Sequence, residues 1–320
     1  MDLYPLTFEP IYQERIWGGR NIARLFARRL PKSKPIGESW ELADLPEGTS
    51  VVANGPLAGK TLTELTRELG PALLGKARPT AQGRFPLLLK YLDAADTLSL
   101  QVHPDEAAAA RIGYGAVAKT ECWYVIESRG GFIYKGLRPR VTAERFRQAV
   151  QANECEKVLR RYEVKAGDFH YIPAGTPHAL GAGVMVAEVQ TPSDTTYRVT
   201  DWGRGRQTHL EQAMQSIHFG ARLPRGTRSE AKTLLRSESF TVRRYTGDKP
   251  IRKPAGNCAA MMYVRGRRPI QVGYGIGGSP RTEAVSLMEI APGRTVLLPA
   301  GIDAAICPAT SSALLLIGCR

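Results

Sequence analysis

Two polar side chains stand on one face of a short strand that the stretch TLSLQVHPDE (residues 97–106) predicts. Period-two alternation turns the leucine and valine side chains to one face and places Gln101 and His103 on the other. An amide and an imidazole that face a protein interior lose their hydration, so a partner must bind them there. The pair is therefore either a buried hydrogen-bonded couple or part of a ligand site.

Two further candidate ligands come from later β segments. In KTECW (residues 119–123), alternation puts Lys119 and Glu121 on the same face. In GDFHYIPAGTPHAL (residues 167–180), a strand over residues 169–172 ends at a turn that contains proline and glycine. The chain turns back there, and a tight turn between antiparallel strands directs His178 toward a barrel interior. His170, inside the first of these strands, does not by itself indicate a ligand.

Taken together, Gln101, His103, Glu121 and His178 form a plausible ligand set for one divalent metal ion. Two imidazoles and a carboxylate are the ligands of many catalytic zinc sites, and a neutral amide oxygen can complete the set. Their net charge of about −1 leaves the ion a strong Lewis acid. Because four ligand types fall on three β elements with compatible facing, a metal site is favoured over separate buried hydrogen bonds.

A second cluster of charged residues lies in the stretch EVQTPSDTTYRVTDWGR (residues 188–204). Asp194 and Arg198 lie close together in it, and Asp201 and Arg204 follow. A guanidinium near a metal can hold a phosphate or an oxyanion, and a nearby carboxylate can relay protons. The alternative for each residue is an ordinary surface ion pair.

The elements that must position these residues are mostly strands. The 32 glycines and 22 prolines are spread along 320 residues, as the many turns of a β-rich fold require. Strands are expected over residues 85–94, in a hairpin of 121–128 and 130–137, between 162 and 201, and from 240 onward. Helices are expected over residues 61–75, 105–111, 142–151 and 208–219. The simplest partition is a domain of residues 1–230 and a smaller β domain of residues 231–320.

Composition narrows the setting in which the protein works. No apolar run approaches the length that spans a bilayer, and the first 19 residues lack a signal core. Five cysteines, an odd number without a C-x-x-C pair, indicate reduced thiols in a cytoplasmic protein. The net charge of +14 is spread over the chain and matches no DNA- or RNA-binding module, so neither a nucleic-acid nor a membrane partner is expected.

The sequence resembles the short bacterial form of the type I phosphomannose isomerases. The similar segments run in order through about residues 10–205, from RIWGG and GESWELAD to GDFHYIPAGTPHALG and SDTTYRVTDWGR. The family belongs to the cupin superfamily, whose second motif is Gly-x5-Pro-x-Gly-x-x-His. The first cupin motif is altered: Gln101 stands where a histidine is common, and the glutamate follows a helical insertion. The resemblance implies a mainly β fold, a cupin-type jelly-roll barrel with helical insertions and a smaller C-terminal jelly-roll-like β domain.

The resemblance also implies a function and roles for single residues. One Zn2+ per chain would be bound by Gln101, His103, Glu121 and His178. Lys119, Asp194 and Arg198 match active-site positions of the family, and Ala118 departs from the glycine that short forms often have. The implied reaction interconverts mannose 6-phosphate and fructose 6-phosphate through a cis-enediolate. Lys119 and Asp194 are both reasonable bases, so the base stays open between them.

The resemblance implies a phosphosugar substrate and a monomer or homodimer. Two other functions remain open from the sequence. One is a metal-dependent cupin isomerase that acts on another sugar, such as unphosphorylated mannose. The other is a non-catalytic cupin that binds a sugar, although such a protein would be expected to lose Lys119, Glu121 or Arg198, and this chain keeps all three.

Overall fold

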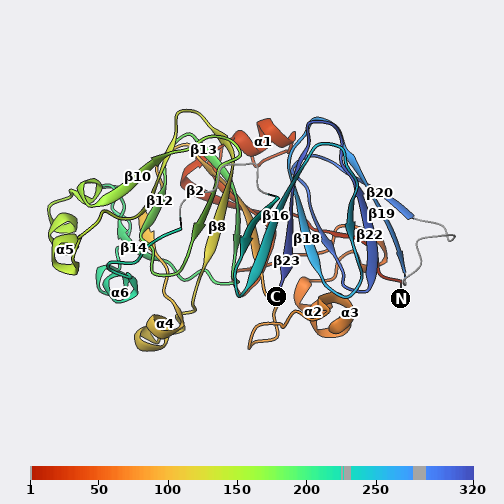
Figure 1. The fold of residues 1–320 in the computed structure, drawn as a ribbon, viewed down its shortest axis with the longest axis horizontal. Coiled ribbons are helices and arrows are strands. Elements are labelled where there is room, and N and C mark those ends of the chain that lie inside the picture. The colour runs from red at the N-terminus through yellow and green to blue at the C-terminus, as the bar shows by residue number, and fades with distance from the viewer. Residues whose placement is uncertain (1, 225, 227–231, 277–285) are drawn as a thin grey trace.

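The computed structural model describes residues 2–224, 226, 232–276 and 286–320. The described residues form four main β-sheets and one two-stranded sheet of β4 (Asp44–Leu45) and β5 (Gly48–Thr49). In Figure 1 the main sheets stand in a row as two β-barrels, each built from two sheets that face one another. The predicted mainly β fold with helical insertions and a C-terminal β portion is confirmed.

The first barrel contains a six-stranded and a five-stranded sheet, called here the N-terminal six-stranded sheet and the five-stranded sheet. The former has the strand order β11 (Phe169–Ile172), β8 (Glu121–Ser128), β13 (Val184–Gln190), β6 (Leu88–Ala94), β2 (Ile11–Gly19), β3 (Ile36–Leu42). The latter has the order β10 (Leu159–Glu163), β9 (Phe132–Leu137), β12 (His178–Leu180), β7 (Leu100–Val102), β14 (Tyr197–Thr200).

The second barrel contains the C-terminal six-stranded sheet and a four-stranded sheet. The six-stranded sheet has the order β1 (Leu6–Thr7), β21 (Thr295–Leu298), β18 (Ala259–Arg265), β23 (Ala313–Cys319), β16 (Phe240–Thr246), β15 (Thr233–Arg236). The four-stranded sheet has the order β17 (Ile251–Lys253), β22 (Ile302–Cys307), β19 (Ile270–Ile276), β20 (Ser286–Ile290). Because β1 pairs with β21, residues near both ends of the chain share one sheet.

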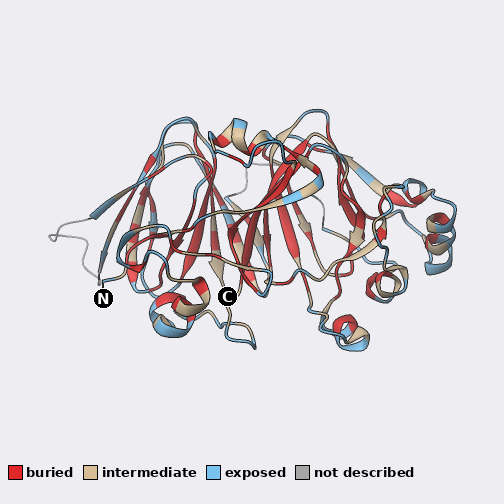
Figure 2. Cartoon of the chain, turned by 180° about the vertical axis from the view of Figure 1, so that it is seen from behind, coloured by how far each residue is buried: buried red, intermediate tan, exposed pale blue. Residues whose placement is uncertain are grey.

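The two six-stranded sheets pack against each other in the middle of the molecule. Their facing side chains, such as Leu89 and Tyr91 of β6 and Val242 and Ile317 of the C-terminal sheet, belong to one hydrophobic cluster. The other face of β6 lines the interior of the first barrel, where Leu92 and Ala94 join a second cluster. Strands β6 and β13 are therefore buried at every residue; Figure 2 shows buried strands throughout the middle of the molecule. A polar side chain on such a strand needs a partner inside the protein.

Six α-helices are described, and they lie outside the barrels. Their bounds are α1 (Asn21–Phe26), α2 (Leu62–Leu69), α3 (Pro71–Leu74), α4 (Glu106–Ile112), α5 (Ala143–Gln151) and α6 (Leu210–Ser216). Helices α5 and α6 contribute Phe146 and Ala213 to a cluster with Leu100 and Val102, on the outer face of the five-stranded sheet. The outer face of β7 is thereby covered, and its polar face is left to the barrel interior.

The expected hairpins were wrong, although their strands exist. Strand β8 pairs with β11 and β13, whereas β9 pairs with β10 and β12, so the turn after Ser128 carries the chain from one sheet to the other. Strands β11 and β12 are likewise in different sheets. Glycine and proline mark a change of direction equally well in a hairpin and at a barrel corner, so the sequence signal does not separate the two.

The expected helices are present, three of them with shorter bounds and the one expected over residues 105–111 displaced by one position as α4. The helix predicted over residues 61–75 is divided into α2 and α3 at Gly70 and Pro71, the stop that the sequence contains. The predicted domain boundary near residue 230 lies outside the described residues. Among the described residues, no helix is both long and apolar enough to cross a membrane.

Candidate active site

A row of side chains on the inner face of the five-stranded sheet brings three predicted residues together. Gln101 of β7 lies opposite Arg198 of β14 on one side and opposite His178 of β12 on the other. Directly opposed residues of antiparallel strands point to the same face of the sheet. Arg198, Gln101 and His178 therefore enter the barrel interior side by side, as the alternation around Gln101 predicts.

The connection after β7 returns the chain to the same interior. Asp105 caps helix α4, since its Oδ1 accepts a hydrogen bond of 2.7 Å from the amide of Ala108. After the helix, the amide of Lys119 donates to the carbonyl of Pro104 at 3.0 Å. This closure places Lys119 and the first residue of β8, Glu121, beside His103. The short helix predicted after Pro104 thus positions two residues of the site.

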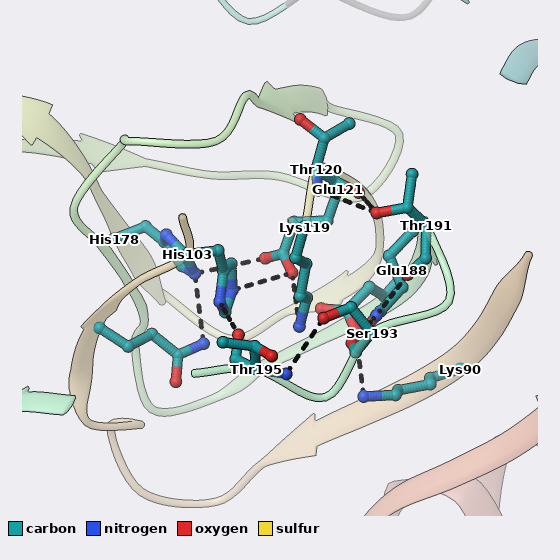
Figure 3. Close-up of polar contacts among 12 residues, drawn as sticks. Lys90, His103, Lys119, Thr120, Glu121, His178, Glu188, Thr191, Ser193 and Thr195 are labelled. Carbon is teal, nitrogen blue, oxygen red and sulfur yellow. Dashed lines mark hydrogen bonds and ion pairs between the residues drawn. The ribbon is translucent and has the colours of Figure 1, made fainter. Parts of the chain in front are cut away.

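His103, Glu121 and His178 converge inside the barrel, all three almost completely buried (Figure 3). Nε2 of His103 lies 3.2 Å from Oε2 of Glu121, and Nε2 of His178 lies 3.3 Å from Oε1. One donor atom from each residue falls within 4.8 Å of the others, a spacing that can hold a metal ion. Three of the four predicted ligands thus lie together in one group that is compatible with a metal ion.

The hydrogen bonds of the two imidazoles leave their inner nitrogens free to act as ligands. Nδ1 of His103 donates to the carbonyl of Thr195 at 2.9 Å, and Nδ1 of His178 donates to that of Thr176 at 2.8 Å. In the neutral ring this assigns the proton to Nδ1 and a lone pair to Nε2. Both Nε2 lone pairs then face the carboxylate of Glu121, and no proton lies between either nitrogen and that carboxylate. A donor set of this kind binds a cation.

Burial and neighbouring charges keep these three groups in the protonation states that metal ligation requires. Burial and the Lys119 ammonium lower the pKa of His103 to about 3. Burial also lowers the pKa of His178. Burial opposes the charge of Glu121, but Lys119 and the two imidazoles outweigh it and hold the pKa of this carboxyl well below its usual range. Neutral imidazoles and an ionised carboxylate are thus the stable forms.

Gln101 completes the group from the side of β7. Its side-chain nitrogen Nε2 lies 3.2 Å from Nε2 of His178. The amide nitrogen can donate to the lone pair of that imidazole, and rotation of the amide by half a turn presents its oxygen instead. Either the nitrogen or the oxygen of the Gln101 amide can therefore reach the point toward which His103, Glu121 and His178 direct their donor atoms.

A pocket of about 390 Å³ leads to this group and contains the predicted catalytic residues. Lys119, Asp194 and Arg198 line it, as does Gln101. Nζ of Lys119 lies 3.1 Å from Oε2 of Glu121. Asp201 and Arg204, which the sequence places after Arg198, instead form an ion pair of 2.9 Å with each other and do not line the pocket.

Five charged residues of the pocket wall were not predicted from the sequence, and three of them are buried: Glu38, Lys90 and Glu188. The other two are Arg15 and Arg206. Lys90 of β6 lies directly opposite Glu188 of β13, and its Nζ is 3.6 Å from Oε1 of Glu188 and 3.4 Å from Oε2 of Glu38. Two indole N–H groups add further hydrogen bonds. That of Trp40 donates to Glu38 and that of Trp123 donates to Glu188, each at 2.8 Å. These residues form a buried, fully partnered network beside the group of His103, Glu121 and His178.

The two carboxyl groups of this network have pKa values that are shifted in opposite directions. Lys90 and Arg15 outweigh the effect of burial on Glu38 and lower its pKa to about 2. Burial and the charge of Glu121 raise the pKa of Glu188 to about 7, in spite of Lys90. The carboxylates of Glu38 and Glu188 raise the pKa of Lys90 above its usual range, although burial opposes this. Glu188 is thus a carboxyl group that can exchange a proton near neutral pH.

A signal for these residues exists in the sequence. Lys90 interrupts the apolar run LLLKYL, and Glu188 interrupts VMVAEV. A charged residue in the middle of an otherwise apolar strand is expensive to bury, so it indicates either a partner across the sheet or a functional site. The sequence alone does not reveal the register in which β6 and β13 pair.

Arg198 differs from the other cations of the pocket in having no carboxylate partner. Arg15 is paired with Glu38, Lys90 with Glu188, Lys119 with Glu121, and Arg206 with Asp201. Within the described part of the chain no ion pair of Arg198 occurs; its Nη1 donates to the carbonyl of Gln207, and its buried Nε is unpartnered. An anionic ligand could therefore pair with this guanidinium without displacing a carboxylate.

Comparisons with known proteins agree with this arrangement. A family model described as phosphomannose isomerase type I, catalytic domain, matches residues 6–126, which include Gln101, His103 and Glu121. The chain is 42% identical over 223 residues to mannose-6-phosphate isomerase of Streptococcus mutans, covering 68% of each sequence. It is 41% identical over 223 residues to mannose-6-phosphate isomerase ManA of Bacillus subtilis, covering 68% of this chain and 69% of the relative.

The likeness extends to the whole fold. The crystal structure of a mannose 6-phosphate isomerase from Bacillus subtilis matches with a TM-score of 0.84 at 29% sequence identity, covering 98% of this chain and 99% of the other. Both barrels are therefore shared with that structure.

Proposed function

The chain belongs to the type I phosphomannose isomerase family, and from this we propose that it interconverts mannose 6-phosphate and fructose 6-phosphate with the help of one zinc ion. The observation that carries the proposal is the convergence of His103, Glu121 and His178 beside a pocket that Lys119 and Arg198 line, with Lys119 in contact with Glu121. The names of the relatives supply the substrate, and the donor set supplies the reason for a metal.

We assign the metal to Gln101, His103, Glu121 and His178. Two imidazole nitrogens, one carboxylate and one amide oxygen suit zinc better than a hard cation such as calcium, which prefers oxygen ligands alone. A zinc ion bound there would supply Lewis-acid stabilisation for a substrate oxygen. Thr176 and Thr195 hold the imidazoles in orientation through their carbonyls, as partners of ligating histidines do.

The remaining pocket residues suit the proton transfer that isomerisation requires. A proton moves between C2 and C1 of the sugar through a cis-enediolate, so the site must take a proton from carbon and bear negative charge on oxygen. Arg198, which has no carboxylate partner among the described residues, is placed to receive negative charge of the substrate. Lys119 and Asp194 are both candidates for the base, and Glu188 joins them because it can exchange a proton near neutral pH.

The substrate assignment has a direct test. With mannose 6-phosphate in a coupled assay that detects fructose 6-phosphate, we expect turnover that a chelator abolishes and added zinc restores. Unphosphorylated mannose is expected to be converted about 10²–10³-fold less efficiently, because binding energy from the remote phosphate contributes to reaching the transition state. Equal turnover of mannose would assign the enzyme to another sugar, and binding of either sugar without turnover would indicate a sugar-binding cupin.

We expect the rate to fall as pH drops through the ionisation of Glu188. Its pKa of about 7 means that the carboxylate, which pairs with Lys90 and could accept a proton, is lost below neutral pH. A dication in the same cavity draws this pKa down, so the loss is expected at or below pH 7. The measurement is kcat/KM from pH 5 to 9 for the wild type and for Glu188→Gln. The sugar phosphate itself ionises near pH 6, and the variant keeps that ionisation while losing the one due to Glu188. Identical profiles would remove Glu188 from the reaction.

For its setting we propose a cytoplasmic enzyme that works as a monomer or homodimer without a nucleic-acid partner. Five cysteines without a C-x-x-C pair and the charge spread along the sequence support this. Size-exclusion chromatography with light scattering at working concentration distinguishes the two oligomeric states.

A further inference from the structure

Cys258 and Cys319 touch each other in the second barrel, away from the site described above. Their sulfur atoms are 3.2 Å apart, the one contact between cysteine sulfurs within the described residues. Cys258 is buried and Cys319 is half-buried, whereas Cys307 is exposed and stands apart from both. The contact is therefore a feature of two particular thiols among the five of the chain.

The C-terminal six-stranded sheet places the two thiols opposite one another. Ala259 of β18 pairs with Gly318 of β23, so Cys258, which directly precedes β18, faces Cys319 at the end of β23. Opposed residues of antiparallel strands have Cβ atoms about 4.5–5.5 Å apart, close to the 3.5–4.5 Å that a disulfide spans. The two ranges meet at about 4.5 Å, so rotation of the two side chains together with a small approach of the two strand ends joins the sulfurs.

The backbone at both cysteines is already fixed by other contacts. Cys319 also pairs with Phe240 of β16, and the amide of the following Arg320 donates to the carbonyl of Ser239 at 3.2 Å. Asn257, next to Cys258, forms a bridge with Gly75 at the end of α3. Since both backbones are held in place, closing the bond requires little further ordering of the chain.

We propose that Cys258 and Cys319 are a modification site, a thiol pair that a peroxide converts to a disulfide. The more accessible sulfur of Cys319 attacks the peroxide and becomes a sulfenic acid with release of one water; the sulfur of Cys258 then displaces the hydroxyl as a second water. Two thiols and one hydrogen peroxide give one disulfide and two waters, so the sulfurs lose two electrons and the peroxide gains them.

The surroundings of the two thiols determine how fast they are oxidised and how the disulfide changes the stability of the barrel. The hydrogen bond to Cys258 and burial raise the pKa of the Cys319 thiol well above its usual range, so oxidation at neutral pH is slow and is expected under sustained oxidant. The bond would close a loop of 61 sequence positions that contains strands β18 to β23. Cross-linking so long a loop restricts the unfolded chain and stabilises the barrel.

The test counts free thiols. Purified full-length protein is treated with hydrogen peroxide, denatured, alkylated with iodoacetamide without reduction, and measured by intact mass. The five cysteines take five labels before treatment and three after it, and peptide mapping links residue 258 to residue 319. Cys319→Ser is expected to keep its four labels after treatment. Cys307→Ser, the matched control, is expected to fall from four labels to two.

Stability supplies a second measurement. The oxidised wild type is expected to melt about 5–10 °C above the reduced protein, dithiothreitol should reverse the shift, and Cys319→Ser should show none. Turnover of the isomerase should be unchanged, because neither cysteine lines the pocket. Retention of all five labels, loss of label that persists in Cys319→Ser, or a dimer linked through Cys307 would each overturn the proposal. The reversible shift of the wild type keeps the test decisive if the serine variants fold poorly.

Discussion

Glu121→Gln is expected to lower kcat/KM for mannose 6-phosphate by about 10³-fold or more and to leave the purified protein with little bound metal. Glu121 is the one carboxylate of the metal-binding group, and both imidazoles face its two oxygens at 3.2 and 3.3 Å. Glutamine keeps the size of the side chain and removes the charge, so the four ligands become neutral. Lewis-acid catalysis contributes several kcal/mol, which corresponds to a loss of this size.

Metal analysis and activity are measured on the same preparation. The matched control is Glu163→Gln, the same exchange at an exposed residue of β10, which should keep both its metal and its turnover. A melting curve establishes that Glu121→Gln is folded. If that variant held one zinc ion per chain and turned over normally, the assignment of the metal to this group would be wrong.

Lys119→Met is expected to lower kcat by about 10²–10³-fold with the metal retained. Lys119 is almost completely buried and places Nζ 3.1 Å from Glu121, inside the pocket. Methionine fills a similar space without the ammonium, so the pocket loses a group that can carry a proton or oppose negative charge. Removing a cation beside Glu121 does not weaken, on electrostatic grounds, the hold of that carboxylate on a metal ion.

The control for this substitution is Lys157→Met, at an exposed position after α5. The base is identified by comparing Lys119→Met with Asp194→Asn in deuterated water. The variant that lacks the base loses exchange of the C2 proton of mannose 6-phosphate with solvent, which proton NMR follows directly. A variant that is slow in net isomerisation and still exchanges that proton has lost charge stabilisation instead. Near-normal turnover of Lys119→Met with zinc bound would remove Lys119 from any central role.

The convergence of Gln101, His103, Glu121 and His178 could be predicted from the sequence because alternation along a strand is a strong constraint. Once residues 100–102 form a strand with an apolar outer face, Gln101 has to point inward, and the register with β12 places His178 beside it. The capped helix α4 was equally legible, since Asp105 and Gly113 mark its two ends. These signals depend only on residues that are close in the sequence, so they do not require knowing which strands lie side by side in the fold.

The partnership of Lys90 and Glu188 could not be predicted in the same way. The two residues are far apart in the sequence and meet only because β6 and β13 are neighbours in one particular register. The wrongly expected hairpin of β8 and β9 has the same cause. Which strand lies beside which is decided by how two sheets close around a shared interior, and turn residues do not encode that choice.

The central position of the N-terminal six-stranded sheet has a consequence for how the protein can vary. Along β6 and β13, successive side chains serve two purposes in turn: one set faces the interior of the first barrel, where Lys90, Leu92 and Glu188 line the pocket, and the set between them holds the two barrels together. A single inserted or deleted residue would exchange the sets, sending Lys90 or Glu188 into the joint between the barrels and leucine or valine into the pocket. The strands can therefore accept substitutions within either set, but their lengths can change only in steps of two.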